Sequence, residues 1–101
     1  MKDVYITIAG ARHYYGLEIF KKGMTVALVK EPDNEVDAEA SKVMLDGLGK
    51  VGYVANSPYT TLGESLSAGR LYDRVRKHAK AEVVTITPKG VLCRVKKKSL
   101  R

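Results

Sequence analysis

The side chains best suited to bind a ligand are gathered in two short stretches of the sequence. The first is Arg12-His13-Tyr14-Tyr15, which places a guanidinium and an imidazole next to two phenol rings. A guanidinium pairs with phosphate through its planar fork of N–H groups, and an aromatic ring offers a flat face to a nucleobase. This stretch therefore combines side chains for phosphate binding and for base stacking.

The second stretch, residues 30–40, is an acidic segment between two apolar runs. Pro32 fixes its own φ angle, and Asp33 and Asn34 favour turns. The segment is longer than a simple β-connection, contains no Gly and is rich in carboxylates. A long loop in a small domain usually has a function, although a solvated acidic connection remains the alternative.

The spacing of these residues argues against the commoner catalytic and metal sites. Asp33, Glu35 and Asp37 alternate as in a calcium loop, but Ala38 and Met44 occupy the positions that need Gly and Glu. A magnesium-dependent nuclease needs carboxylates from separate elements, whereas the acidic residues concentrate in one loop here. No Gly-rich phosphate loop is present. We therefore expect no metal, no cofactor and no small-molecule substrate.

The composition is that of a single globular domain. The chain has 101 residues, of which 45% are hydrophobic and 29% are charged, and its patterns predict no membrane span and no signal peptide. A single Cys excludes an internal disulfide, and one Cys with two His is too few for a structural zinc site. We expect a cytoplasmic protein that does not bind membranes.

The basic residues are unevenly distributed along the chain. The formal net charge is +7, and the basic side chains concentrate in two windows, which contain Arg70, Arg74, Arg76, Lys77 and Lys80, and Arg94, Lys96, Lys97, Lys98 and Arg101. Such a distribution favours a polyanionic partner that follows one face of the protein. The alternative is that the Lys-rich tail only adds solubility.

The apolar patterns predict a mainly β fold. Runs of β-branched and aromatic residues predict six short strands, at residues 4–8, 25–30, 41–46, 50–54, 81–87 and 91–96. Residues 17–20 fit a short strand or a helical turn. Ser67 can cap a helix that has Leu71 and Val75 on its inner face. The polar face of this helix would carry Arg70, Arg74, Arg76 and Lys77. The sequence therefore predicts a small β-barrel of about six strands with one or two short helices.

Three positions carry more specific expectations. Gly52, inside a strand, indicates a β-bulge or a close approach by another group. Cys93 has apolar neighbours in its strand and is predicted to lie in the core. If residues 12–15 are extended, Tyr14 and Tyr15 point to opposite sides, so one of the two is expected in the core.

Three segments together resemble the HIRAN domain. They are Arg12-His13-Tyr14-Tyr15-Gly16, then Glu31-Pro32-Asp33-Asn34-Glu35-Val36-Asp37-Ala38-Glu39-Ala40, and Gly52-Tyr53-Val54 after the predicted hairpin. The resemblance is close over residues 4 to about 55 and extends to the rest only through the order of elements. It implies an OB-like barrel at residues 1–96 and a standalone chain of the bacterial type. Separately, the basic tail at 97–101 is expected to be frayed, because chain ends usually are.

The resemblance also implies a function. HIRAN domains of fork-remodelling ATPases of the helicase-like transcription factor type bind the 3′ end of single-stranded DNA. The likeness implies a non-catalytic module for 3′-hydroxyl ends in DNA repair or stalled-fork processing, with 3′ ends and other DNA-repair proteins as partners. Arg12 would then contact phosphate, Tyr14 would stack on the terminal base, and Asn34 and Asp37 would hold the 3′-hydroxyl.

Other positions extend this expectation. His13 and Tyr53 depart from the fork remodellers' pattern but keep a flat ring, so we expect them to contact DNA as well. Lys30, Arg70 and Arg74 are expected to contact the phosphate backbone. A free 3′-hydroxyl can donate a hydrogen bond to a carboxylate, whereas an internal 3′ oxygen has no proton to give. The alternatives are a protein-interaction module that uses residues 57–70, and a metal-dependent nuclease.

Overall fold

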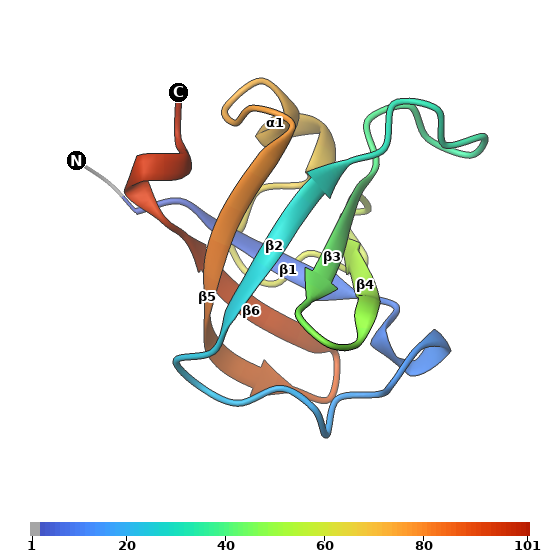
Figure 1. Ribbon diagram of the computed structural model, residues 1–101, viewed down its shortest axis with the longest axis vertical. Helices are drawn as coiled ribbons and strands as arrows, with labels where there is room; N and C mark the ends of the chain where they lie inside the picture. Colours follow the sequence, from blue (N-terminus) through green and yellow to red (C-terminus); the bar gives the residue numbers. More distant parts are fainter. Residues whose placement is uncertain (1–2) are drawn as a thin grey trace.

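Six antiparallel strands close into a barrel in a computed structural model that describes residues 3–101 (Figure 1). Around the barrel the strands follow the order β1-β4-β3-β2-β5-β6. Two 3₁₀ turns and one short helix complete the fold. The elements in chain order are β1 (Tyr5–Ala9), η1 (Ala11–His13), β2 (Thr25–Lys30), β3 (Ser41–Leu45), β4 (Gly49–Val54), α1 (Ala68–Tyr72), β5 (His78–Thr87), β6 (Gly90–Val95) and η2 (Lys97–Ser99).

The barrel interior is filled by side chains that alternate along the strands. In β1, Ile6 and Ile8 are fully buried, and in β6 the buried residues Val91, Cys93 and Val95 alternate with half-exposed ones. Alternation places every second side chain on one face, which here is the inside of the closed sheet. Burial raises the pKa of the Cys93 thiol to about 12, as expected for a core residue. The predicted mainly β barrel and the predicted core position of Cys93 are confirmed.

The strand boundaries differ from the predicted ones at a few ends. β2 has the predicted bounds, whereas β5 begins at His78 instead of residue 81. The added residues were missed because they are polar or small, yet Ala79 is buried and His78 pairs with Val29 of β2. Residues 17–20 form a turn in which the Phe20 N–H donates to the Leu17 carbonyl at 3.1 Å, and the Phe20 side chain is buried.

Gly52 lies where β4 is both irregular and crowded. The β3–β4 register shifts between Val43 and Met44, which is the predicted bulge. A Cβ atom at position 52 would lie 2.8 Å from Ile8 Cγ2 and 3.0 Å from the Ala9 carbonyl oxygen. The β-bulge and the close approach of another group, which the sequence indicated as alternatives, are therefore both present at Gly52.

Helix α1 is shorter than the sequence predicts. Ser67 caps it as expected, because its Oγ accepts a hydrogen bond from the Arg70 N–H at 3.3 Å. The helix ends at Tyr72, so the prediction that Arg74 and the basic residues after it lie on its polar face is wrong. Val75 is buried as predicted, but it forms a β-bridge with Leu100 instead of a helical contact.

The tail at 97–101 is docked, which corrects the expectation of a frayed end. Its N-terminal part is the turn η2, and the Arg101 N–H donates to the Arg74 carbonyl at 2.8 Å. The Ser99 Oγ accepts a hydrogen bond from the Lys80 N–H at 2.9 Å. These contacts satisfy backbone groups of the segment, which gives it a fixed position that its composition does not reveal. No helix among residues 3–101 is long and apolar enough to span a membrane.

Candidate nucleic-acid interface

The segment after β1 presents its polar and aromatic side chains to solvent. Gly10 takes a φ of 73°, a conformation that other residues rarely adopt, and turns the chain from β1 into η1. Ala11 is buried, whereas Arg12 and His13 are exposed. The prediction that one of the two tyrosines is in the core is wrong, since Tyr14 is 39% exposed and Tyr15 is 50% exposed. The reason is that this segment is a tight turn and not an extended strand.

Tyr14 lies beside a second ring contributed by β4. The ring centroids of Tyr14 and Tyr53 are 6.5 Å apart, with 53° between the planes. Lys50 lies near both, because its Nζ is 5.9 Å from the Tyr14 centroid and 4.8 Å from the Tyr53 centroid. An ammonium at such distances is attracted to the negative ring faces. We call Tyr14, Lys50 and Tyr53 the aromatic cluster.

Glu31, at the start of the acidic loop, connects that loop to the aromatic cluster. Its Oε1 accepts hydrogen bonds from the Tyr53 hydroxyl at 2.8 Å and from Asn34 Nδ2 at 3.0 Å. Its Oε2 lies 3.5 Å from Lys50 Nζ and 3.9 Å from Lys42 Nζ. Partial burial acts to raise the pKa of Glu31, but the two hydrogen bonds and the two ammonium groups outweigh burial and lower it. Glu31 is therefore an ionised anchor for both sides of the site.

The basic member of the cluster is held in its charged form. The hydrogen bond from Lys50 Nζ to the Tyr53 oxygen, at 2.8 Å, raises the pKa of Lys50, and nearby Glu31 adds to this effect. Burial opposes the shift but does not cancel it. The ammonium of Lys50 therefore remains available beside the two rings at any physiological pH.

The acidic loop is organised by Asn34 and Asp37. Asn34 Oδ1 accepts hydrogen bonds from the Val36 N–H at 2.9 Å and the Asp37 N–H at 3.0 Å. Asp37 Oδ1 accepts from the Glu39 N–H at 2.9 Å, and its Oδ2 accepts from Asn56 Nδ2. Both hydrogen bonds that the side-chain carbonyl of Asn34 can accept are therefore made within the loop. The carboxylate of Asp37 retains acceptor capacity, because its two oxygens can together accept about four hydrogen bonds.

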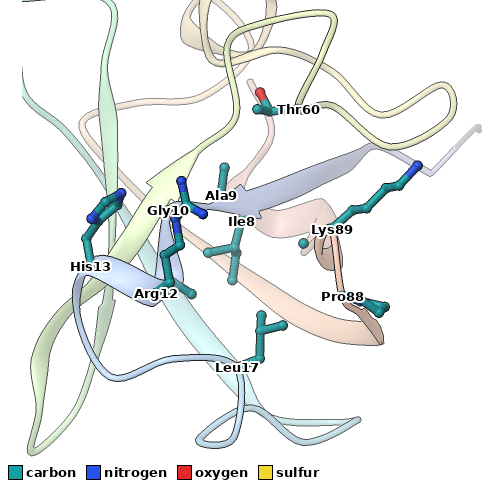
Figure 2. Close-up of a pocket in the computed structure, with 11 residues that line it drawn as sticks. Ile8, Ala9, Gly10, Arg12, His13, Leu17, Thr60, Pro88 and Lys89 are labelled. Atoms are coloured by element: carbon teal, nitrogen blue, oxygen red, sulfur yellow. The ribbon is translucent and has the colours of Figure 1, made fainter.

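Arg12 and His13 line a separate cavity of about 370 Å³ next to the cluster. Figure 2 shows the two side chains rising from η1 on one side of this cavity, with Pro88 and Lys89 on the other. Two cationic side chains, Arg12 and Lys89, thus border one hollow. The remaining lining residues are Ile8, Ala9, Gly10, Ala11, Leu17, Thr60 and Gly90.

The other expected phosphate contacts lie in different surroundings. Lys30 Nζ is 4.1 Å from the Tyr72 ring centroid, at the end of β2 that leads into the acidic loop. Arg70 and Arg74 border a second cavity, of about 830 Å³, whose wall includes residues 62–66. The structure therefore pairs Tyr14 with Tyr53, links Tyr53 to Asn34 through Glu31, and places the two arginines elsewhere.

Sequence reasoning missed Glu31 and Lys50 as members of this site. The position of Glu31 inside the segment that resembles the HIRAN pattern was one signal that could have identified it. Its hydrogen-bond partner Tyr53 lies 22 residues further on, so no local pattern connects the two. Nothing in the neighbourhood of Lys50 marks it as more than a strand residue. No group of three or more His, Cys, Asp or Glu in the part of the chain from residue 3 onward could hold a metal ion.

Glu31 predicts a pH dependence of stability. Its pKa in the folded protein is below the ordinary 4.5, so its contribution is complete above that value and is lost as pH falls through the folded pKa. Glu31→Gln should lower the unfolding free energy near neutral pH by about 1 kcal/mol, because it removes the charge from a partly exposed network. Urea unfolding of both proteins from about pH 7 to about pH 3.5 should show the difference shrinking.

Glu35→Gln is the matched control, since Glu35 is exposed in the same loop. The unfolding curves of that variant should follow the wild type over the whole pH range. A constant difference between wild type and Glu31→Gln down to the lowest pH would contradict the assignment of Glu31 as the titrating anchor.

A small closed β-barrel with exposed rings, cations and an acidic loop at one side defines a class of nucleic-acid-binding modules. The sequence model of the HIRAN domain matches residues 1–96. The chain therefore belongs to the HIRAN domain family, a family of nucleic-acid-binding domains, and this membership supports a DNA-binding module.

Comparison with solved structures supports the fold. A crystal structure of a protein from Lactobacillus plantarum is similar, with a TM-score of 0.62 and 23% sequence identity. The match covers 93% of this chain and 93% of that one. No curated protein matches the sequence significantly.

Proposed function

We propose that this domain binds the 3′ end of single-stranded DNA at its free hydroxyl, without catalysing a reaction. Tyr14 and Tyr53 receive the terminal base, Arg12 and His13 contact the neighbouring backbone, and the loop at 31–40 reads the 3′-hydroxyl. Free 3′ ends are exposed where strands are broken or where replication stalls, so the role belongs to DNA repair or stalled-fork processing.

The observation that carries this proposal is the contact chain from the rings to the loop. The ring centroids of Tyr14 and Tyr53 are 6.5 Å apart, the Tyr53 hydroxyl donates to Glu31, and Glu31 accepts from Asn34. A base stacked on the rings would therefore have the acidic loop beside its sugar. Stacking on an aromatic side chain contributes about 1–3 kcal/mol per base and tolerates any base.

Asp37 and Asn34 have different tasks in this proposal. Asp37 keeps free acceptor sites and takes the proton of the 3′-hydroxyl in a charge-assisted hydrogen bond. Asn34 acts as a positioning residue, because its oxygen already holds the Val36 and Asp37 N–H groups. A strand that continued past this point would place a phosphate next to the Asp37 carboxylate, and the like charges would repel it.

The direct experiment compares oligonucleotides that end in a 3′-hydroxyl or a 3′-phosphate, by fluorescence anisotropy. The wild type should bind the hydroxyl form about tenfold or more tightly, as expected for a hydrogen bond to a charged acceptor. Asp37→Asn should lose most of this preference, because the neutral amide neither attracts the hydroxyl proton as strongly nor repels the phosphate.

Asp33→Asn removes the same charge from an exposed position of the same loop and should keep the wild-type preference. Equal affinity of the wild-type protein for the two ends would overturn the proposal of 3′-hydroxyl recognition.

A second candidate function is the binding of a protein partner through residues 57–70. Tyr59 favours it, because this large side chain is 96% exposed in a turn after β4. In a pull-down from a nuclease-treated sample, the wild type should still capture the protein partner, whereas Tyr59→Ala should not. The variant should leave DNA affinity unchanged. Weakened DNA binding by this variant would instead assign Tyr59 to the nucleic-acid interface.

A further inference from the structure

The fold gathers most of the two basic windows of the sequence into one surface, without Arg70 and Arg94. We define the basic ridge as the basic side chains of residues 74–80 and 96–101, which are Arg74, Arg76, Lys77, Lys80, Lys96, Lys97, Lys98 and Arg101. All are exposed except Lys96, which is half-buried. The windows are separated by most of the hairpin β5–β6, so their proximity is a property of the fold.

Backbone contacts hold the two halves of the ridge together. The Lys96 N–H donates to the Lys80 carbonyl at 2.9 Å, and the Arg101 N–H donates to the Arg74 carbonyl at 2.8 Å. The bridge between Val75 and Leu100 lies between these contacts. Because Ala79, Ala81 and Val95 point into the barrel, their neighbours Lys80 and Lys96 point outward from it.

The charges of the ridge are almost unopposed within the described residues. Among residues 3–101, its one ion pair joins Lys97 Nζ to Asp3 Oδ1 at 3.8 Å. Crowded like charges repel one another, and folding brings these closer than the sequence does. A fixed surface of this kind attracts a polyanion, whose binding removes the repulsion.

The ridge is continuous with the loop of the candidate site. The Lys30 N–H donates to the Lys77 carbonyl at 3.0 Å, and the next residue, Glu31, donates its N–H to the carbonyl of Ala40 at the far end of the loop. Figure 1 shows the C-terminal segment, the turn before β5 and the loop at 31–40 along the same end of the barrel. A strand held at the loop could therefore pass directly onto the ridge.

We infer that the basic ridge binds the sugar–phosphate backbone of the DNA strand upstream of a 3′ end held at the loop, an inference that rests on the function proposed above. The aromatic cluster reads the terminal nucleotide, and the ridge adds affinity that depends on strand length. Phosphate contacts of this type carry no sequence information and weaken with salt.

The test measures the affinity of 3′-hydroxyl oligothymidylates of about four and about sixteen nucleotides, lengths that bracket the sites of single OB-type barrels. The wild type should bind the longer strand roughly tenfold more tightly at low salt. The double variant Lys77→Glu/Lys98→Glu should bind both lengths equally. Its salt slope on the longer strand should fall by about 1.4, or about 0.7 for each lost phosphate contact.

Lys21→Glu/Lys22→Glu is the matched control, with the same change in net charge. These two exposed lysines lie before β2, at the opposite end of that strand from Lys30. The control should keep the wild-type length dependence. Retention of length dependence by the ridge variant, or its equal loss in the control, would overturn the inference.

The same short oligonucleotide separates this inference from the proposed function. The ridge variant should keep the preference for a 3′-hydroxyl over a 3′-phosphate on the strand of about four nucleotides, because the loop and rings are unchanged. Absence of that preference in the wild type would speak against 3′-end recognition, whereas the ridge is judged on length dependence alone.

Discussion

Tyr14→Ala should weaken the binding of single-stranded DNA by about 1–3 kcal/mol, or roughly 5- to 150-fold in dissociation constant. The Tyr14 ring is the more exposed of the two rings in the aromatic cluster, and it lies two residues after Arg12, the expected phosphate contact. Its removal takes away one stacking face. Lys50, whose Nζ lies near both rings, also loses one of its two cation–π partners. Anisotropy titration with a 3′-hydroxyl oligonucleotide measures the loss.

Two further variants make this prediction specific. Tyr14→Phe keeps the ring and should bind almost as well as the wild type. Tyr15→Ala removes the neighbouring ring, which is directed elsewhere, since its hydroxyl donates to the Leu48 carbonyl at 3.1 Å. A larger loss of affinity in Tyr15→Ala than in Tyr14→Ala would transfer the stacking role to Tyr15 and contradict the assignment of the cluster.

Gly52→Ala should destabilise the fold by about 2–3 kcal/mol, near the upper end for an overpacked core. The added methyl group would meet Ile8 Cγ2 at 2.8 Å and the Ala9 carbonyl oxygen at 3.0 Å. The second contact is backbone, so β1 and β4 must separate to relieve it. Because Tyr53 follows directly and pairs with Ala9, the same shift should displace a ring of the aromatic cluster. Chemical denaturation and DNA titration of one preparation measure both effects.

Gly16→Ala separates crowding from backbone strain. Gly16 has a φ of 78°, and an added Cβ atom there would have no neighbour within 4 Å, so only the left-handed conformation opposes the substitution. Its cost should be about 1 kcal/mol. Gly52→Ala should therefore unfold at a clearly lower denaturant concentration than Gly16→Ala. Equal midpoints for the two variants would show that the contacts of position 52 are easily relieved.

The strands were predictable because their signal is local. Runs of β-branched, aromatic and other apolar residues occupy most of the five or six consecutive positions of β1, β2 and β6, and most of the buried side chains of these strands come from those runs. The interior irregularity at Gly52 also had a local signal, a glycine inside a β-branched run. The predicted helix was longer than α1, because the charged residues after Tyr72 suit a helix surface as well as they suit a loop.

The candidate site was predictable only in part, because its connections are long-range. Tyr14, Asn34 and Tyr53 were chosen from the residues and the family likeness, and the structure joins them through contacts. Glu31 was missed because its importance depends on Tyr53 and Lys50, which reach it only when β2, β3 and β4 are aligned. The docking of the tail was likewise invisible, since Leu100 and Val75 carry no pattern that pairs them.

The pairing of β1 with both β4 and β6 has a consequence for the time course of folding. Tyr5 pairs with Arg94, so the barrel closes only after almost the whole length of the chain has been searched. Contacts between distant residues slow two-state folding, typically into the range of milliseconds to seconds. A fragment of residues 5–56 would contain the rings and the acidic loop but would lack the last two strands that complete their scaffold. On the ribosome, the DNA-binding surface should therefore form late, when β6 emerges.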